Sequence, residues 1–354
     1  MSGMADGGVG AGTGRRAVRR TSIADVARLA GVSQGTVSNV LNHPDRVSGD
    51  TLARVQEAIA LLDFVPHGPA RSLAAGSTRA LGLILSDLTN SLFVDIGRGV
   101  ESVAWERQAF VLIANTDSDL ARERQYLATF DASQTLATLV TINDASHYQQ
   151  LVDLHRPGRP LVFLNYRGPA RGHCTVDMDN RHGARLAARH LIETGRRRLA
   201  IVGGPMMLQP VAERVEGFTE EASAAGVALF HESVADLDRS HGFAAGLALR
   251  ARVEAGEIDG IFAVADLVAA GVAQGLATSS SIEIPRDVGI VGYDDNRASW
   301  DSPLPLTTLR QPGAAMGAAG AELAFAEIED PAHEHRSVTL EPELVVRRST
   351  VDPG

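Results

Sequence analysis

The sequence SQGTVSN, residues 33–39, places hydrogen-bonding side chains in one short run that then turns apolar. The amides of Gln34 and Asn39 each carry a donor and an acceptor, the combination that pairs with the edge of adenine in DNA. Gly35 offers no side chain to a base and lets the backbone approach closely. Three hydroxyls in the run can contact phosphates, and they belong to Ser33, Thr36 and Ser38. Taken alone, the run fits either a surface that reads DNA or a plain capped surface helix, and the residues around it decide between the two.

The run is flanked by patterns typical of short amphipathic helices. Before it, Ser22 and Asp25 form a helix cap close to a capping box, and Gly31 can end that helix in a left-handed conformation. The residues expected on the buried face of this first helix are Val26, Ala27, Leu29 and Ala30. Ser33 can cap a second helix. The buried stripe of this second helix is expected to be Val37, Val40 and Leu41.

A third helix, expected from about Thr51 to Leu62, completes the unit. Its apolar residues recur at helical spacing, and they are Leu52, Val55, Ile59 and Leu62. Two short helices joined by a glycine-containing turn form a helix-turn-helix, and the first residues of its second helix face base edges in the major groove. We therefore predict an all-α DNA-binding head over residues 21–65, after a disordered Gly- and Arg-rich tail over residues 1–20.

The distribution of charge agrees with such a head. Residues 1–79 hold nine arginines against six acidic residues, a net charge of +3, and residues 80–354 hold 24 arginines against 37 acidic residues, a net charge of −13. A small basic piece on a large acidic body fits a head that binds nucleic acid and a body with another task. By charge alone, the stretch RRAVRR (15–20) is equally well explained as a basic tail of no specific purpose.

Composition and motif searches exclude several classes of protein. The 354 residues suit two or three domains, and 44% apolar with 21% charged residues is globular composition. No apolar run is long enough to span a bilayer and no secretory leader opens the chain, so we expect no membrane partner and a cytoplasmic location.

Chemistry beyond binding is not indicated. The single cysteine, Cys174, forms no internal disulfide and no metal site by itself. The Gly-rich stretches VGGP and GVG match no dinucleotide-binding, phosphate-binding or nucleophile-elbow motif, and the histidine pair of HEH (333–335) is expected to be solvated. We therefore predict no catalysis, no cofactor and no metal site.

After Gly76 the sequence alternates between buried strands and amphipathic helices. The expected strands are ALGLIL (80–85), AFVLIA (109–114), ATLVTI (137–142), PLVFLN (160–165), RLAIVGG (198–204), GIFAVAD (260–266) and DVGIVGYDD (287–295). The expected helices are 91–107, 119–131, 181–194, 211–225, 240–255 and 267–278. Such alternation predicts parallel sheets covered by helices, and the strands are too many for one sheet of usual width. We predict a two-lobed α/β domain over residues 80–354, in which the tail 337–350 adds strand pairing.

Polar side chains stand where these strands end, and open parallel sheets bind ligands at that edge. The candidates are Asp87, Asn90, Asn165, Arg167, Asp266, Asp294 and Asp295. Plainer roles stay open for three of them. Asp266 can be a helix N-cap, Asp295 can close a turn with Asn296, and Asp87 can be structural.

The head and the segment after it resemble the lactose-repressor (LacI/GalR) family of bacterial transcription regulators. The match runs without a gap from Thr21 to Gly76, through TSIADVARLAGVSQGTVSNVLN and RVSGDTLARVQEAIALLDFVPHGPARSLAAG. The resemblance implies that Gln34, Gly35 and Asn39 are the main base-reading positions.

The resemblance also implies a hinge helix, PARSLAAG, within residues 66–79. The same segment can be an interdomain linker, and both roles are compatible if it is a linker in the free protein and a helix on DNA. Arg71 would then contact the operator DNA, and Leu73 would be pushed into the minor groove. An apolar wedge of this kind kinks the duplex and needs a second wedge from a partner chain. We therefore expect a homodimeric repressor on a palindromic operator.

The α/β domain resembles the ligand domain of the same family, which is similar to periplasmic sugar-binding proteins. The matching stretches are DLTNSLF, ERVEGF, VGYDD and LTTLRQP. The resemblance implies a small-molecule effector, sugar-like by default, that is contacted by Arg214, Asp294 and Gln311 with Phe93 on the wall of the cleft.

Three positions depart from the family. Ala265 stands where an asparagine often precedes Asp266, Leu237 stands where sugar-binding relatives often carry an aromatic ring, and Ser91 stands where proline is common. These departures leave the effector open between an unusual sugar, a nucleoside and none at all. The alternative function is a sugar-binding protein without gene regulation, which would require export.

Overall fold

The computed structural model describes residues 21–64, 79–169, 172–278, 281–301, 303–330 and 332–351. The chain separates into two compact units, Met1–Ala75 and Gly76–Gly354. The predicted tail and most of the predicted hinge lie outside the described residues, so their boundaries stay predictions. No helix in the described ranges is both long and apolar enough to cross a membrane.

The first unit consists of short helices. They are α1 (Ile23–Ala30), α2 (Gln34–Asn42), the 3-10 helix η1 (Pro44–Arg46) and α3 (Gly49–Leu61). The carboxylate of Asp25 accepts hydrogen bonds from the backbone amide and the hydroxyl of Ser22, at 3.0 and 2.6 Å, which fixes the start of α1. Gly31 ends this helix at a φ of 67°, a conformation that favours glycine.

The three helices enclose a small apolar core, and the buried members are Val26, Ala27, Ala30, Val37, Val40, Val55, Ala58 and Phe64. The prediction that Leu29 is buried is wrong, because its side chain is 51% exposed. At about 100° per residue, Leu29 lies about 60° outside the arc spanned by Val26, Ala30 and Ala27.

Within the described residues, the second unit contains two six-stranded sheets. Lobe 1 has the strand order β11-β5-β4-β3-β1-β2, and lobe 2 has the order β12-β10-β9-β8-β6-β7. The strands of lobe 1 are β1 (Ala80–Leu85), β2 (Phe110–Asn115), β3 (Ala137–Thr141), β4 (Leu161–Leu164), β5 (Cys174–Met178) and β11 (Ser337–Leu340). The strands of lobe 2 are β6 (Arg198–Gly203), β7 (Ala228–Ser233), β8 (Gly260–Ala263), β9 (Gly289–Asp294), β10 (Thr307–Arg310) and β12 (Glu343–Val345). Every pairing is parallel except that of β12 with β10.

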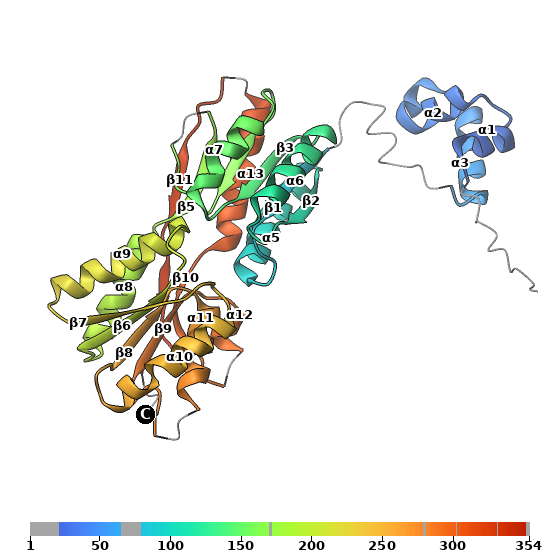
Figure 1. Ribbon diagram of the computed structural model, residues 1–354. Helices are drawn as coiled ribbons and strands as arrows, with labels where there is room; N and C mark the ends of the chain where they lie inside the picture. Colours follow the sequence, from blue (N-terminus) through green and yellow to red (C-terminus); the bar gives the residue numbers. More distant parts are fainter. Residues whose placement is uncertain are drawn as a thin grey trace, which may run out of the picture. The chain divides into compact units, whose positions relative to one another are not determined.

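Helices pack against both sheets (Figure 1). In lobe 1, α5 (Ser91–Glu106) and α13 (Gly313–Glu329) share one apolar core, while α6 (Leu120–Ala132) and α7 (Ala145–Leu154) share another. In lobe 2, α8 (Asn180–Glu193) packs with α9 (Gln209–Ala224), and α10 (Arg239–Glu254) packs with α11 (Asp266–Leu276). A short helix, α12 (Arg297–Trp300), follows β9. The predicted α/β class with two parallel sheets flanked by helices is confirmed.

The chain passes between the lobes at three points of its described part: between β5 and α8, between β10 and α13, and between β11 and β12. Three short segments of the chain therefore connect the two lobes. The parallel strands of each lobe end toward the space between the lobes. This arrangement places the ends of the predicted strands where one small molecule could touch both lobes.

Each predicted strand is present, but several elements were missed. The prediction that the second strand is buried is wrong, since Phe110 and Ile113 of β2 are 54% and 53% exposed. This strand lies at the edge of its sheet and lacks a full cover of helices. The missed strands are β5, β7 and β10, whose sequences CTVDM, ALFHES and TTLR interrupt apolar residues with polar ones.

Candidate functional site

The DNA-reading candidate is the exposed side of α2 in the first unit. Successive residues of a helix are rotated by about 100° around its axis. Viewed down the axis of α2, one arc of about 140° therefore carries, in order, Gln34, Ser38, Gly35 and Asn39. Val37 and Val40 on the other side are buried in the core. The side-chain amides of Gln34 and Asn39 are exposed and make no hydrogen bond within the described residues. Both amides are therefore available to a base edge.

The hydroxyls at the start of α2 already have partners. The Ser33 Oγ accepts a hydrogen bond from the Thr36 backbone amide at 3.1 Å and lies 2.9 Å from the Thr36 Oγ1. Residues 31–35 spell G-V-S-Q-G, which has the letters of a hydrolase nucleophile elbow. Such an elbow joins a strand to a helix, whereas this serine caps a helix that follows another helix. The serine is a cap and carries no sign of a nucleophile.

Two further predicted DNA contacts, Arg71 and Leu73, lie outside the described residues. Their roles in the hinge stay predictions.

The ligand candidate is a cavity of about 110 Å³ between the two lobes. From lobe 1 it is lined by Asp87, Asn90, Leu92, Phe93, Ser118, Asn143 and Asn165. From lobe 2 it is lined by Leu208, Pro210, Val211, Arg214, Asp236, Leu237, Ala265, Leu267 and Asp294. Five predicted effector contacts are thus brought together, namely Asp87, Phe93, Asn165, Arg214 and Asp294.

Arg214 lies at the centre of the lobe 2 wall. Its side chain reaches from α9 and is only 4% exposed. Its Nε donates to the Asn180 Oδ1 at 2.9 Å, and its Nη1 donates to the Val264 carbonyl at 2.8 Å. The guanidinium carbon stands 3.8 Å from the centre of the Tyr293 ring, a cation–π contact. A buried cation with these partners is fixed in position before any ligand arrives.

Asp294 ends β9 and links both lobes. Its Oδ1 lies 3.5 Å from the Arg214 Nη1 and accepts a hydrogen bond from the Gln311 Nε2 at 2.6 Å. Its Oδ2 accepts a hydrogen bond from the Asn90 Nδ2 of lobe 1 at 3.1 Å. Burial raises the pKa of Asp294, while Arg214 and the two amides act in the opposite direction. The residue has a φ of 110°, a costly conformation for a side chain other than glycine and one that persists only where surrounding contacts hold it.

The lobe 1 wall offers amides and a carboxylate. The Asn165 Nδ2 donates to the Asn143 Oδ1 at 2.7 Å, and both residues follow strands. The Asn165 Oδ1 is buried and makes no hydrogen bond within the described residues, so it can accept one from a ligand. The Asp87 carboxylate accepts hydrogen bonds from the backbone amide and hydroxyl of Thr89, both at 2.7 Å. Phe93 is buried and supplies the apolar side of the wall.

Comparisons with known proteins match both parts of the chain. Residues 22–67 match bacterial regulatory proteins of the lacI family, and residues 188–350 match a periplasmic binding protein-like domain. The ribose operon repressor of Escherichia coli (strain K12) is 31% identical over 329 residues, which cover 92% of this chain and 98% of that protein. The chain belongs to the LacI family of bacterial regulatory proteins.

A second repressor and a solved structure are also similar to this chain. The HTH-type transcriptional repressor PurR of Aliivibrio salmonicida (strain LFI1238) is 30% identical over 330 residues, covering 93% of this chain and 98% of the relative. The structure of the lac repressor dimer bound to operator and the anti-inducer ONPF matches with a TM-score of 0.80 at 22% identity, over 94% of this chain and all of the other. This LacI-family chain is therefore a DNA-binding transcription regulator, and its family is one of regulators and not of enzymes.

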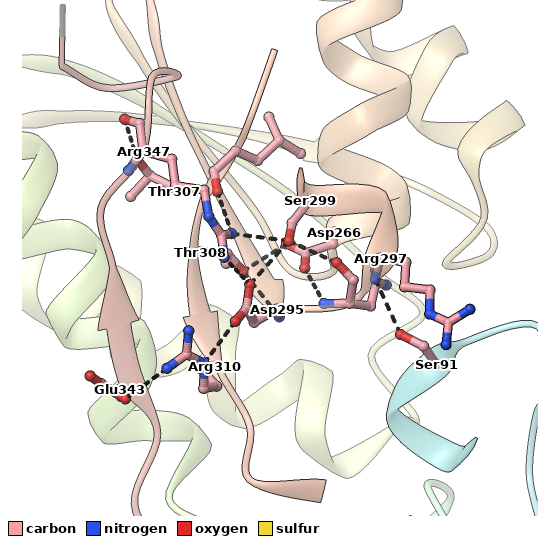
Figure 2. Close-up of polar contacts among 12 residues, drawn as sticks. Ser91, Asp266, Asp295, Arg297, Ser299, Thr307, Thr308, Arg310, Glu343 and Arg347 are labelled. Carbon is pink, nitrogen blue, oxygen red and sulfur yellow. Dashed lines mark hydrogen bonds and ion pairs between the residues drawn. The ribbon is translucent and has the colours of Figure 1, made fainter. Parts of the chain in front are cut away.

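Two predicted effector contacts of this LacI-family chain lie outside the cavity lining. Gln311 is buried behind Asp294, to which it donates its hydrogen bond. Asp266 is fully buried and does not line the cavity. Its Oδ1 accepts a hydrogen bond from the Thr308 hydroxyl at 2.7 Å (Figure 2), and its Oδ2 accepts one from the Asn296 backbone amide at 2.9 Å. It begins α11 after the N-cap Ala265. Both residues hold the wall of the cleft in place without lining it.

The same region explains two residues of the VGYDD stretch. Gly292 packs directly against Asp266, and a Cβ there would collide with the Asp266 Oδ1. Asp295 accepts from the Arg310 Nε at 2.7 Å and from the Arg347 Nη2 at 2.6 Å (Figure 2). It therefore clamps the strand β10 and the C-terminal segment together, which is more than closing a turn.

Sequence reasoning missed several contributors to the cleft. Asn180 orients Arg214, and Asn143 pairs with Asn165. Asn180 follows β5, one of the missed strands, so no strand-end signal drew attention to it. Asn143 directly follows the expected third strand, and the rule that ligands bind at strand ends could have found it.

We expect Asp266→Asn to flatten the pH dependence of stability. Burial and the charge of Asp294 raise the pKa of Asp266 well above its usual value. A carboxyl with a raised folded-state pKa stabilises the fold at low pH and loses that contribution as the pH rises through the folded-state pKa. Urea unfolding at pH 5 and pH 8 should show the variant losing less stability than the wild type between the two. Identical pH dependence in both proteins would contradict the raised pKa.

Proposed function

We propose that this regulator is a repressor that binds a palindromic operator as a homodimer. Binding of a small molecule in the cleft would lower or raise its affinity for the operator. The exposed amides of Gln34 and Asn39 carry the proposal. They have no partner in the described residues and project from the second helix of a helix-turn-helix, whose first residues read base edges. We also propose that it acts in the cytoplasm, where bacterial DNA lies.

The dimer is supported by the hinge. The family resemblance implies that Leu73 of each of two chains would supply one apolar wedge, and that the two wedges together would unstack a base step and kink the duplex. Arg71 in the same segment would contact the DNA. A two-fold protein then requires a two-fold operator. The lac repressor, whose fold this chain shares, is described as a dimer bound to operator.

The effector is proposed to be a small hydroxyl-rich molecule, a sugar or a nucleoside. The cavity of about 110 Å³ is smaller than the roughly 300 Å³ of many ligand pockets, so the ligand is small or enters as the lobes open. The buried Asn165 Oδ1 can accept a hydrogen bond from a hydroxyl. The relative named ribose operon repressor supports the sugar, and Leu237, in place of an aromatic ring, weakens it.

The effector would change the DNA affinity through the contacts between the two lobes. Asn90 of lobe 1 donates to Asp294 of lobe 2, and the Gln209 backbone amide of lobe 2 donates to the Asn143 carbonyl at 2.7 Å. A ligand that competes for these groups changes the balance between lobe arrangements in proportion to its differential affinity. Induction and corepression are the two signs of this one linkage.

Selection of bound sequences from a random DNA library by the purified full chain tests the proposal. We expect an enriched palindrome with a fixed centre, and addition of sugars or nucleosides should change the affinity for it. Binding that is only salt-sensitive and shows no enriched sequence, with and without these metabolites, would overturn the proposal. The alternative, a sugar-binding protein without gene regulation, predicts that no DNA sequence is enriched and that the protein nevertheless binds a sugar.

A further inference from the structure

Four side chains that commonly ligate metals meet at one edge of lobe 1: Cys174, Glu327, His333 and His335. Cys174 is the first residue of β5, and Glu327 lies in the last turn of α13. The two histidines lie in the segment that leads from α13 into β11. The parallel pairing of Ser337 in β11 with Thr175 in β5 brings that segment beside Cys174. The regular fold therefore assembles the group from residues that are far apart in the sequence.

The distances match those of a metal site. The Cys174 Sγ lies 3.1 Å from the His333 Nε2 and 3.9 Å from the His335 Nδ1. The His335 Nδ1 lies 3.7 Å from the Glu327 Oε2, and one potential ligand atom from each residue lies within 4.8 Å of the others. Tetrahedral bonds of about 2.0–2.3 Å place ligand atoms about 3.3–3.8 Å apart. Only small side-chain movements separate the observed group from that geometry.

Hydrogen bonding alone does not satisfy the group. A thiol–imidazole hydrogen bond can account for the contact of Cys174 with His333. The Glu327 Oε2, however, is buried and makes no hydrogen bond within the described residues. A buried carboxylate oxygen that lacks a hydrogen bond and faces a thiol and two imidazoles requires an explanation. A bound cation would satisfy all four groups together.

We propose that Cys174, Glu327, His333 and His335 bind a zinc-class transition-metal ion. Thiolate, imidazole and carboxylate are the ligands that zinc takes in proteins, and a thiolate disfavours calcium and magnesium. Four protein ligands leave no open position, which is the pattern of structural sites. The ion therefore ties the end of α13 to the starts of β5 and β11. The sequence analysis expected no metal site, because Cys174 and the HEH stretch look unrelated along the chain.

The site lies at a particular edge of the sheet. Because β5, β4, β3 and β1 are parallel, β5 starts at the same edge at which β1 starts, at Ala80. That edge receives the chain from the predicted hinge, and it is opposite the strand ends that line the cleft. The proposed metal site and the effector cleft therefore lie at opposite edges of the lobe 1 sheet.

Titration of the untagged, chelator-treated full chain with Co²⁺ under reducing conditions tests the proposal. We expect a thiolate-to-cobalt charge-transfer band and tetrahedral ligand-field bands that saturate at one ion per chain and disappear when Zn²⁺ is added. Cys174 is the only cysteine in the chain, so the charge-transfer band has a single possible source. Absence of that band in the wild type would overturn the proposal.

Variants separate the site from adventitious binding. Glu327→Gln and His335→Ala should each weaken Co²⁺ and Zn²⁺ binding at least about tenfold, since even partners behind the ligands contribute that much. His231→Ala, an exposed histidine on β7, should bind as the wild type does. At one Zn²⁺ concentration, the ion should raise the melting temperature of the wild type and of His231→Ala by more than it raises that of the two site variants.

The variants must be compared in their metal-free forms by circular dichroism, so that loss of the fold is recognised. Should His335→Ala fail to fold, Glu327→Gln, which retains the shape of its side chain, decides alone. Unchanged Zn²⁺ affinity in folded Glu327→Gln and His335→Ala would assign the ion to other groups and overturn the proposal. Operator selection does not depend on this result, because chelator-treated protein can be tested for DNA binding separately.

Discussion

Arg214→Met is expected to abolish the effector response and to destabilise the second unit by about 3 kcal/mol, the scale for removing one partner of a buried ion pair. The guanidinium is 4% exposed and holds Asn180, the Val264 carbonyl and Asp294 in place. Methionine fills similar space without donors, so the Asn180 Oδ1 loses its hydrogen-bond donor and the Asp294 carboxylate loses the positive charge beside it while keeping its amide donors. The wall of the cleft then loses the group that fixes its charge.

Urea unfolding followed by tryptophan fluorescence measures the loss. Both tryptophans, Trp105 and Trp300, lie in the second unit, so the signal reports on that unit. Arg124→Met is the matched control, because Arg124 is exposed on α6 and away from the cleft, and it should change stability little. Adding Asp294→Asn to Arg214→Met should recover part of the loss by removing the unpaired charge. Equal destabilisation by both arginine variants, or a normal effector response in Arg214→Met, would contradict the assignment.

The elements that could be predicted are those whose residues are apolar without interruption. The strand ALGLIL (80–85) is buried along its whole length, and its run of residues without a polar side chain predicts that burial. The strand CTVDM (174–178) is equally buried, yet it contains Thr175 and Asp177. The hydroxyl of Thr175 bonds Ser337, and Asp177 pairs with Arg167, so partners elsewhere in the chain make these polar residues tolerable. A pattern within one segment does not contain that information.

The candidate sites divide in the same way. A position at the end of a parallel strand predicts the region of Asp294 and Asn165 correctly, because the topology brings strand ends together. A strand-end position does not determine the direction in which the side chain points. Asp266 is consequently buried behind the wall of the cleft and does not line it. The group around Cys174 depends on contacts between β5, α13 and the segment before β11. No spacing rule along the sequence could have identified it.

Asn39→Ala is expected to weaken binding to the selected operator by about 1–3 kcal/mol, the contribution of one bidentate contact to a base. Binding to random DNA should change little, since that binding comes mainly from phosphate contacts. The Asn39 side chain is exposed and makes no hydrogen bond within the described residues, so its removal should leave the stability of the head unchanged. Loss of affinity can then be assigned to the interface and not to the fold.

Gln56→Ala provides the control, because Gln56 is also exposed in the first unit but lies on α3, away from the arc of α2. Fluorescence anisotropy with operator and scrambled duplexes at several salt concentrations measures both variants. Loss of a base contact lowers operator affinity without changing the slope of log affinity against log salt, whereas loss of a phosphate contact reduces that slope by about one. If Asn39→Ala weakened both duplexes equally and reduced the slope, Asn39 would hold the backbone, and base reading would fall to Gln34 on the same arc.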